Sequence, residues 1–318
     1  MKSSIHRART LAAHAQPYGL GTRACIVGIS ALFGALFLCS SVARAQSVTT
    51  ISTLPYEIKT PGTYVLAGNM ALDANVAAIA IQSGNVTLDC RGYRITGATR
   101  YPDIVAIFAV VGLSDVSIKN CTVVNFDRGI TAGWGGYRTQ ILDNQVIDGG
   151  ARGITILGSD ALVSGNRVIG LRSKPGGTSE GIMLREFDAG ILSVNVRVLD
   201  NVVANIFGDS ITRGIVVGQS SAPEIAGNTI LDIRGNPAYS SYSYYIHFPE
   251  YVTGPFVENA VVRQNVMMSR MLPAEYVSDR AYGGKPQATA ACRDNVSVGF
   301  RVIDYSTCQL PERNVDIE

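Results

Sequence analysis

Short segments of alternating apolar and polar residues recur along most of the chain, and each ends in an asparagine followed by a second apolar pair. The segments read VSIKNCTVV, TQILDNQVI, ALVSGNRVI, VRVLDNVVA, PEIAGNTIL and VVRQNVMM, with a weaker RDNVSVGF near the C-terminus. They place an asparagine at the equivalent position of each repeat: Asn120, Asn144, Asn166, Asn201, Asn228, Asn265 and Asn295. Spacings of 22 to 37 residues are typical of a solenoid, in which each repeat forms one coil.

A second motif, a Gly-Ile pair that opens a strand, recurs in phase with the asparagines. It occurs at Gly129, Gly153, Gly181 and Gly214, and AAIAI, IVAIFAV and YYIHF are variants of it. Each coil is therefore predicted to contain a Gly-Ile strand, a short connection, a strand of the form xVxxxN, a turn and a brief third strand. Because a strand rises about 3.3 Å per residue, twenty-odd residues complete one turn with three short faces. Equivalent strands should pair in parallel, with Val, Ile, Leu and Ala directed inward.

The asparagine column has two structural explanations in such a fold. Asparagine tolerates the left-handed backbone conformation that a sharp turn between two faces requires. Stacked at the spacing of parallel strands, asparagine side chains also form hydrogen bonds with the amides of the neighbouring coils. We expect these structural roles, rather than sugar or ion binding, at the asparagine positions.

The segments VTLDCRGYRITG, VSIKNCTVVNFDRGI and TPGTYVLAGN resemble the right-handed parallel β-helix repeat proteins of the pectate-lyase-like superfamily. This resemblance implies an all-β fold, a single-stranded right-handed parallel β-helix, or solenoid, with N- and C-terminal caps. It implies no single activity, because the superfamily contains lyases, hydrolases, epimerases and adhesins. The chain lacks the adjacent Asp residues and Gly-His-Gly segment of the polygalacturonase-like hydrolases, and the Asp-Pro-His signature of the alginate epimerase-like members. It also lacks the dense Asp cluster of the calcium-dependent lyases.

The two ends of the chain depart from the repeat. Residues 1–45 have the features of a signal peptide: basic residues without acids, an apolar run from Ala24 to Cys39, and small residues at Ala43 and Ala45. This run is shorter than the roughly 20 residues of a membrane span, which favours a secreted or periplasmic protein without a stable membrane span over an uncleaved anchor. Residues 46–75 are expected to cap the first coil, residues 76–270 to form the coils, and residues 271–318 to form a last coil and C-terminal cap.

Removal of the leader changes the charge and the cysteine count. Five of the 27 basic residues lie in the leader, which leaves 22 against 25 acidic residues, a net charge of about −3 and no indication of nucleic-acid binding. Cys292 and Cys308 are the expected disulfide of an exported protein. Cys90 and Cys121 fall in matching strands of adjacent coils, where they either form a bridge or pack as small apolar side chains. No spacing of Cys and His indicates zinc, and we expect no cofactor.

The candidate chemistry lies on the outer surface. The residues just before the Gly-Ile pairs should form one outward column, at about 4.8 Å per coil: Arg128, Arg152, Glu180 and Arg213. Because arginine pairs with carboxylates in two-point geometry, this column would suit an acidic polysaccharide. The alternative is a solvated ladder in which Glu180 relieves the repulsion between Arg152 and Arg213. Further candidate substrate-binding residues are Asp209 and two residues of the Tyr-rich insertion at 234–256, Tyr244 and His247.

Three classes of function fit these features. The first is a surface that binds a polysaccharide, and the second is a polysaccharide lyase or glycoside hydrolase acting on the same face. The third is a structural or adhesin-like solenoid that mediates protein contact. Hydrolysis would need a pair of carboxylates, and no spacing selects one from the available set: Glu180, Asp209, Asp127 and Glu250. We therefore expect an exported β-helix protein that binds a polysaccharide, with cleavage as an open alternative and the catalytic residues unassigned.

Overall fold

The computed structural model describes residues 48–97, 103–184, 193–236, 238, 242–248, 257–270, 279–284, 290–300 and 308–317. The chain divides into two units, Met1–Arg44 and Ala45–Glu318, and all described residues belong to the second. The expected signal peptide, residues 1–45, therefore lies outside the described residues. In the part of the chain that is described, no helix is long and apolar enough to cross a bilayer.

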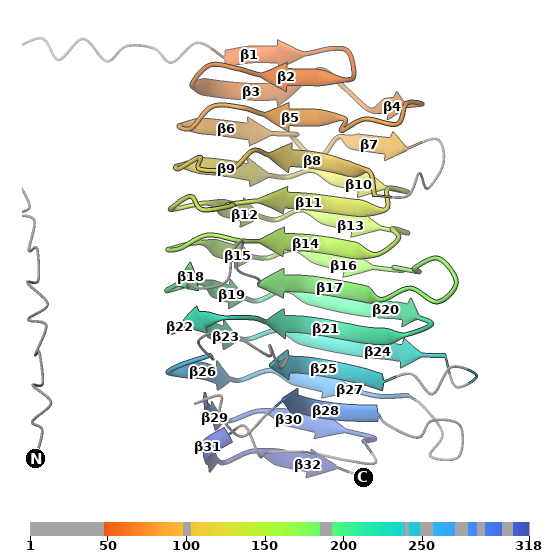
Figure 1. The fold of residues 1–318 in the computed structure, drawn as a ribbon, viewed down its shortest axis with the longest axis vertical. Coiled ribbons are helices and arrows are strands. Elements are labelled where there is room, and N and C mark those ends of the chain that lie inside the picture. Colours follow the sequence, from red (N-terminus) through yellow and green to blue (C-terminus); the bar gives the residue numbers. More distant parts are fainter. Residues whose placement is uncertain are drawn as a thin grey trace, which may run out of the picture. The chain divides into compact units, whose positions relative to one another are not determined.

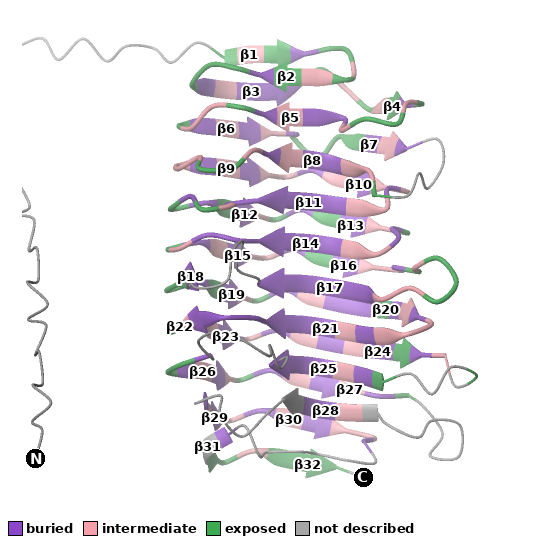
Figure 2. Cartoon of the chain, in the orientation of Figure 1, coloured by how far each residue is buried: buried purple, intermediate pink, exposed green. Residues whose placement is uncertain are grey.

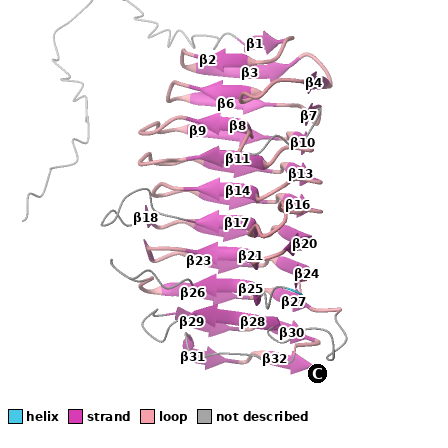
Figure 3. Ribbon diagram, turned by 45° about the vertical axis from the view of Figure 1, so that its right-hand side comes forward, coloured by secondary structure: helices cyan, strands magenta, loops and turns pink. Residues whose placement is uncertain are grey.

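Three long parallel sheets build the second unit, and the chain visits them in a fixed cyclic order (Figures 1 and 3). We call them sheets A, B and C. A typical coil runs through β11 (Arg128–Ala132) of sheet B, β12 (Gln140–Leu142) of sheet A and β13 (Gln145–Ile147) of sheet C before it returns to sheet B with β14 (Arg152–Ile156). The coils wind in the right-handed sense, so the fold is a right-handed parallel β-helix, as predicted.

The remaining strands of the three sheets stack on this coil. Sheet A also contains β1 (Val48–Ile51), β3 (Gly62–Leu66), β6 (Val86–Asp89), β9 (Val116–Lys119), β15 (Leu162–Ser164), β19 (Arg197–Leu199), β23 (Glu224–Ala226), β26 (Ala260–Arg263), β29 (Ala290–Arg293) and β31 (Cys308–Glu312). Sheet B also contains β2 (Tyr56–Ile58), β5 (Ile79–Ile81), β8 (Val105–Ala109), β17 (Ser179–Leu184), β21 (Ile211–Val217), β25 (Tyr242–Phe248) and β28 (Asp279–Gly284). Sheet C also contains β4 (Met70–Leu72), β7 (Arg94–Gly97), β10 (Thr122–Val124), β16 (Arg167–Ile169), β20 (Val202–Gly208), β24 (Thr229–Gly235), β27 (Val266–Met268), β30 (Val296–Val298) and β32 (Val315–Ile317). A small fourth sheet pairs β18 (Ser193–Val194) with β22 (Ser220–Ser221).

The terminal segments contribute strands to the same sheets. In the segment expected to cap the first coil, 46–75, the described residues form β1 to β4, and the segment 271–318 contributes β28 to β32. The boundaries between caps and coils stay a prediction from the sequence.

The Gly-Ile motif is explained by a close approach of sheets B and C. A Cβ atom at Gly153 would overlap with the side chain of Val168 on sheet C and with the carbonyl oxygen of Gly181 in the next coil. The same clash recurs at Gly129 against Val146 and the carbonyl oxygen of Gly153. Glycine is therefore required in the four sheet B strands that carry the motif, β11, β14, β17 and β21, and the isoleucine that follows it, such as Ile154, is fully buried in the central core.

A column of buried asparagines links the coils where sheet A turns into sheet C. This asparagine ladder consists of Asn144, Asn166, Asn201, Asn228, Asn265, Asn295 and Asn314. In the first six, Nδ2 donates to the Oδ1 of the next asparagine at 2.9–3.0 Å, and the backbone N–H of the same residue donates to that Oδ1 as well. Asn314, which is partly exposed, ends the column. The second Nδ2 proton is donated to a backbone carbonyl, for example that of Val163 from Asn201 at 3.0 Å. The predicted stacking of amides is therefore confirmed.

Two details of the predicted column are wrong. Asn120 does not belong to the ladder, because Lys119 pairs with Leu142 and Cys121 therefore takes the position opposite Asn144. The left-handed conformation also belongs to the residue before each ladder position, with a φ of 54° at both Asn120 and Asp143. The ladder asparagines are not among the residues with positive φ, so amide bonding rather than turn geometry explains them. Asn314, which the sequence pattern missed, extends the ladder at its C-terminal end.

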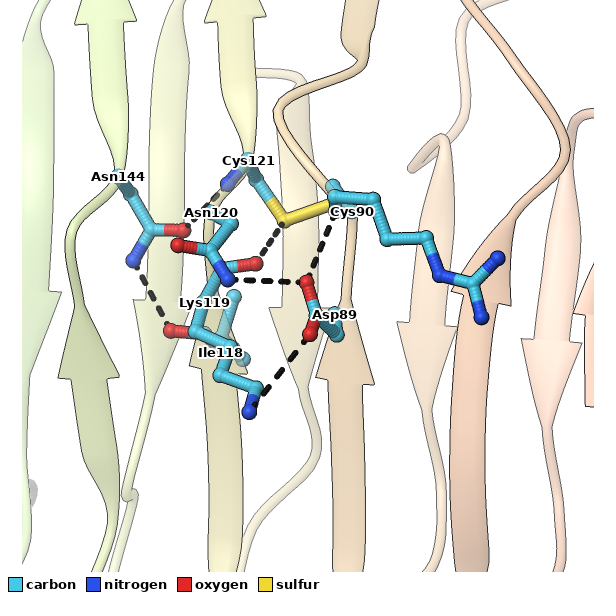
Figure 4. A network of polar contacts seen from close by, with 8 residues as sticks. Asp89, Cys90, Ile118, Lys119, Asn120, Cys121 and Asn144 are labelled. Atoms are coloured by element: carbon cyan, nitrogen blue, oxygen red, sulfur yellow. Dashed lines mark hydrogen bonds and ion pairs between the residues drawn. A yellow bond between two sulfur atoms is a disulfide. The ribbon is translucent and has the colours of Figure 1, made fainter. Parts of the chain in front are cut away.

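A disulfide continues the column at its N-terminal end (Figure 4). The backbone N–H of Cys121 donates to Asn144 Oδ1 at 2.9 Å, and its sulfur is bonded to Cys90 of the preceding coil. The open question about this cysteine pair is thus answered by a bridge, and the expected Cys292–Cys308 disulfide is also present. Beside the first bridge, Asp89 accepts a hydrogen bond from Asn120 Nδ2 at 3.0 Å, so Asn120 supports the turn from outside the ladder.

We predict that Asn201→Ala lowers the free energy of unfolding by about 3 kcal/mol. The substitution leaves the buried N–H groups of Asn166 and the carbonyl of Val163 without their hydrogen-bond partner. Asn120→Gly keeps the left-handed turn and loses one peripheral hydrogen bond, so its cost should stay below about 1 kcal/mol. Urea unfolding followed by circular dichroism measures both. An equal loss in the free energy of unfolding for both substitutions would show that the ladder hydrogen bonds stabilise the fold no more than a peripheral one does.

Candidate functional site

The stacking of sheet B brings five of the seven predicted site residues into one outward column. Successive strands pair Arg128 with Arg152, Arg152 with Glu180, Glu180 with Arg213, and Arg213 with Tyr244. The next pair joins Tyr244 to Arg280 of β28. We call the six residues the sheet B column: Arg128, Arg152, Glu180, Arg213, Tyr244 and Arg280.

Glu180 is the centre of this column. Its Oε2 accepts a hydrogen bond from Arg152 Nε at 3.0 Å, and its Oε1 accepts one from Arg213 Nη1 at 2.6 Å. The Glu180 side chain is only 4% exposed, whereas those of Arg152 and Arg213 are 29% and 16% exposed. A buried carboxylate is tolerated only with such partners, so Glu180 fixes both guanidinium groups in place. The alternative predicted from the sequence, in which Glu180 relieves the repulsion between Arg152 and Arg213, is observed, but Glu180 is buried rather than solvated.

Arg128 ends the column on the N-terminal side. Its Nη2 forms an ion pair with Asp103 Oδ1 at 2.6 Å, and the Asp103 side chain is 71% exposed. The Nε atoms of Arg128 and Arg213 are buried and have no hydrogen-bond partner among the described residues. The column therefore contains four guanidinium groups and one buried carboxylate, together with one exposed carboxylate at its edge.

A second outward column lies beside the first and is buried. Figure 2 shows that β17 is buried along its whole length. The in-register residues of this second column are Thr131, Thr155, Met183, Val216 and His247. None of them belongs to the central core cluster, which contains the residues that alternate with them. The outer face of sheet B is therefore a partly enclosed surface.

His247 and Tyr244 form an aromatic pair at the C-terminal end of this face. Their ring centroids lie 4.1 Å apart at an interplanar angle of 20°. Tyr242 in turn stacks on Tyr244, with 6.2 Å between the ring centroids. Burial lowers the pKa of His247 to about 3, and the positive charges of Arg213 and Arg280 add to this effect. The imidazole is thus neutral at neutral pH, and its Nδ1 has no hydrogen-bond partner in the described part of the chain.

Asp209 is not part of the sheet B column. Its carboxylate accepts hydrogen bonds from the Asn236 side chain at 2.9 Å and from the Gly176 backbone N–H at 3.0 Å. These two bonds hold the pKa of Asp209 below its usual value and fix the glycine-rich loop that precedes β17. Asp209 is therefore placed as a support for a loop.

The other carboxylates considered for hydrolysis do not face one another as a catalytic pair would. Asp127 accepts hydrogen bonds from the backbone N–H groups of Asp103 at 3.0 Å and Ala151 at 3.3 Å, which fixes the turns beside sheet B. Glu250 lies outside the described residues. Glu180 is held by two arginines. None of the described candidates is a free carboxylate opposite another one, as two-carboxylate hydrolysis would require.

Sequence reasoning missed Arg280. Its strand, DRAYGG, lacks the Gly-Ile pair and follows an irregular stretch, so the repeat could not be extended to it. The sequence contains one weak signal: Tyr282 follows Arg280 by two positions, as an isoleucine follows the other arginines of the column, and in the structure Tyr282 pairs with Ile246. Among the residues that the structure describes, no group of His, Cys, Asp and Glu side chains is arranged to hold a metal ion.

Comparisons with known proteins give a limited result. No protein-family model matches the chain, and no curated protein sequence is similar to it. Among solved structures, a mutant tailspike protein of E. coli bacteriophage HK620 in complex with a pentasaccharide matches at 13% identity over 75% of this chain and 50% of its own, with a TM-score of 0.43. The GH136 lacto-N-biosidase from Eubacterium ramulus matches at 10% identity over 83% and 59%, with a TM-score of 0.47.

A third solved structure is the catalytic domain of a GH87 alpha-1,3-glucanase in complex with nigerose, at 14% identity, with 86% and 62% of the two chains covered and a TM-score of 0.44. This chain thus spans between 50% and 62% of the length of the three structures. At these identities and TM-scores the likenesses carry no information about substrate or activity. The assignment as a parallel β-helix rests on the sheets themselves.

We predict that His247 makes the stability of the protein depend on pH between about 3 and 6.5. Its folded pKa lies below the unfolded value, so the unfolded state binds the additional proton in this window and stability falls as the pH is lowered. Between pH 7 and pH 5 the loss should be about 2 kcal/mol. His247→Gln should remove this part of the pH dependence in urea unfolding. Parallel pH profiles of the two proteins would contradict the burial of a neutral imidazole.

Proposed function

We propose that the outer face of sheet B binds an acidic polysaccharide. The observation that supports this most is the sheet B column, in which four arginines are aligned with one buried carboxylate, bound by two of them, beside a stacked tyrosine and histidine. We propose a polymer rather than a small ligand, because the column is a linear row with one residue on each successive coil.

The charges of the column favour carboxylate or sulfate groups. Glu180 uses one N–H group each of Arg152 and Arg213, and a guanidinium has five N–H donors. The remaining donors of the more exposed Arg152 are oriented by that bond and are available to a ligand. Arginine is suited to this role because its planar fork matches a carboxylate in two-point geometry. Coil spacing places these forks about 4.8 Å apart per coil, which suits a polymer with repeated anionic groups.

The aromatic pair favours a sugar as the carrier of those groups. Tyrosine rings pack against the apolar C–H faces of sugar rings, while their hydroxyl groups form hydrogen bonds. Tyr242 is 46% exposed and stacks on Tyr244, which itself stacks on His247, so an aromatic surface continues the charged column. Export to the periplasm or the medium, where such polymers occur, is part of the proposal and is supported by the two disulfides.

Cleavage of the polymer is the catalytic extension of this proposal. The described carboxylates do not form a pair for hydrolysis. Elimination instead needs a cation next to the substrate carboxylate and a base that removes the neighbouring carbon-bound proton; the C=C bond forms as the glycosidic C–O bond breaks, and the departing oxygen takes up a proton from the base or from water. Arg213 and Arg280 are the cations nearest to the neutral imidazole of His247. This imidazole can accept a proton, but its pKa of about 3 makes it a weak base, so elimination through His247 would be slow. Elimination is therefore the reaction class that we assign to this face if turnover is found.

Binding of uronate oligosaccharides, measured by calorimetry, tests the proposal. Arg152→Gln keeps a donor for Glu180 but removes the cation, and Tyr244→Leu removes the aromatic face, so each should weaken binding about tenfold. Arg167→Gln is the matched control, because it removes one exposed arginine from sheet C.

Unchanged affinity in both sheet B variants, or no binding of any glycan by the wild-type protein, would contradict the proposal. In the second case, protein contact by a non-catalytic, adhesin-like solenoid becomes the better account. Ultraviolet absorbance of the unsaturated product separates elimination from binding alone.

A further inference from the structure

A groove of about 640 Å³ lies on the outer face of sheet A, apart from the sheet B column. Its walls come from β19, β23, β26 and β29 and from the turns that precede β15, β19, β23 and β26. None of the lining residues belongs to either outward column of sheet B. The groove is thus a separate surface feature that the proposed function does not use.

Three arginines line this groove. Arg263 and Arg293 are in register on neighbouring strands, although their charges repel each other, and Arg197 lies at the start of β19. Arg263 is held by Glu224, whose Oε1 accepts hydrogen bonds from its Nε at 3.1 Å and its Nη2 at 2.6 Å. Arg197 and Arg293 are exposed, and neither is paired with a carboxylate within the described residues. Two unpaired cations therefore remain in the groove.

The carboxylates of the groove are both engaged. Glu224 binds Arg263, and Asp160 Oδ1 accepts a hydrogen bond from Asn195 Nδ2 at 3.2 Å. An anionic ligand would therefore meet two free guanidinium groups, while each carboxylate already has a donor. The groove thus has more arginines than carboxylates, in spite of the net negative charge expected for the mature chain.

One wall of the groove is opened by an unusual alanine. The turns before the sheet A strands place a residue with left-handed backbone in each coil: Asp160, Asn195, Ala222 and Asn259, with φ between 52° and 55°. Asp and Asn adopt this conformation far more readily than other residues. Ala222 has the same strained backbone without a polar side chain, which leaves space where the other coils carry one.

We propose that the sheet A groove is a second binding site for an anionic polysaccharide, which Arg197 and Arg293 recognise through carboxylate or sulfate groups. The two arginines lie on strands three coil steps apart, about 14 Å along the axis, so repeated anionic groups fit them better than one small anion. The amide side chains of Asn195 and Asn259 suit sugar hydroxyl groups. Because no aromatic side chain is among the described residues that line the groove, these residues give no support to stacking of nucleic-acid bases.

Calorimetry on the full chain carrying Arg152→Gln and Tyr244→Leu tests this site without the contribution of sheet B. The probes are a heparin-derived oligosaccharide, an oligogalacturonate, a neutral glucan oligosaccharide and a single-stranded oligodeoxynucleotide. We expect one or both anionic oligosaccharides to bind and the neutral oligosaccharide to give no binding heat. Arg197→Gln combined with Arg293→Gln should reduce the affinity at least tenfold, and raised salt should weaken binding further.

Two further variants exclude a general loss of structure. Ala222→Asn relieves the backbone strain and fills the groove, so it should weaken binding although the protein unfolds at the same or a higher urea concentration. Arg167→Gln on sheet C should change neither property. Unchanged affinity in the double arginine variant overturns the proposal, and so does equal binding of the oligodeoxynucleotide.

The two sites can fail independently. If the sheet B substitutions abolish all glycan binding, the sheet A groove is not a site, and the function proposed for sheet B stands. If the sheet A substitutions, introduced into the otherwise wild-type protein, abolish all glycan binding, the sheet B column is not a site and the sheet A groove stands.

Discussion

The saturated hydrogen bonding of the asparagine ladder is the constraint on which the rest of the structure depends. A buried amide without partners destabilises a fold by several kcal/mol, whereas each interior member of the ladder uses both Nδ2 protons and fills its Oδ1. These bonds form only when successive coils are aligned at the ladder position. A slip of one residue would break the amide bonds and also turn the apolar side chains of the sheets outward. At the N-terminal end of the ladder, the Cys90–Cys121 disulfide fixes the same alignment of adjacent coils by a covalent bond.

The alignment of the coils determines what the outer faces present. On sheet B it superimposes residues that are 24 to 36 positions apart and so assembles a buried carboxylate between two arginines. On sheet A it brings Arg263 and Arg293 into adjacent positions in a groove that Ala222 also lines. Both surfaces are carried by strands whose positions are fixed by the core, which is a favourable setting for a binding site. The two binding proposals are consequences of the same repeat.

The sequence allowed the repeat, the parallel pairing and most of the sheet B column to be predicted, because each depends on a period that is visible in the residues. Asn120 was assigned to the ladder because it matched the letter of the pattern, while the true position held Cys121 one residue later. Asp209 lies close to Arg213 in the sequence, but its carboxylate binds Gly176 and Asn236 rather than joining the column. Arg280 and the sheet A groove were missed because they depend on irregular connections, whose lengths and turn residues follow no period.

Native-state hydrogen exchange of individual amides tests the central role of the ladder most directly. The backbone N–H groups of Asn166, Asn201 and Asn228 donate to side-chain oxygens rather than to a strand. If the ladder holds the coils in register, these three protons exchange only on global unfolding, as slowly as those of the central sheet strands. Exchange of these protons by local opening, at rates close to those of exposed turns, would contradict the account.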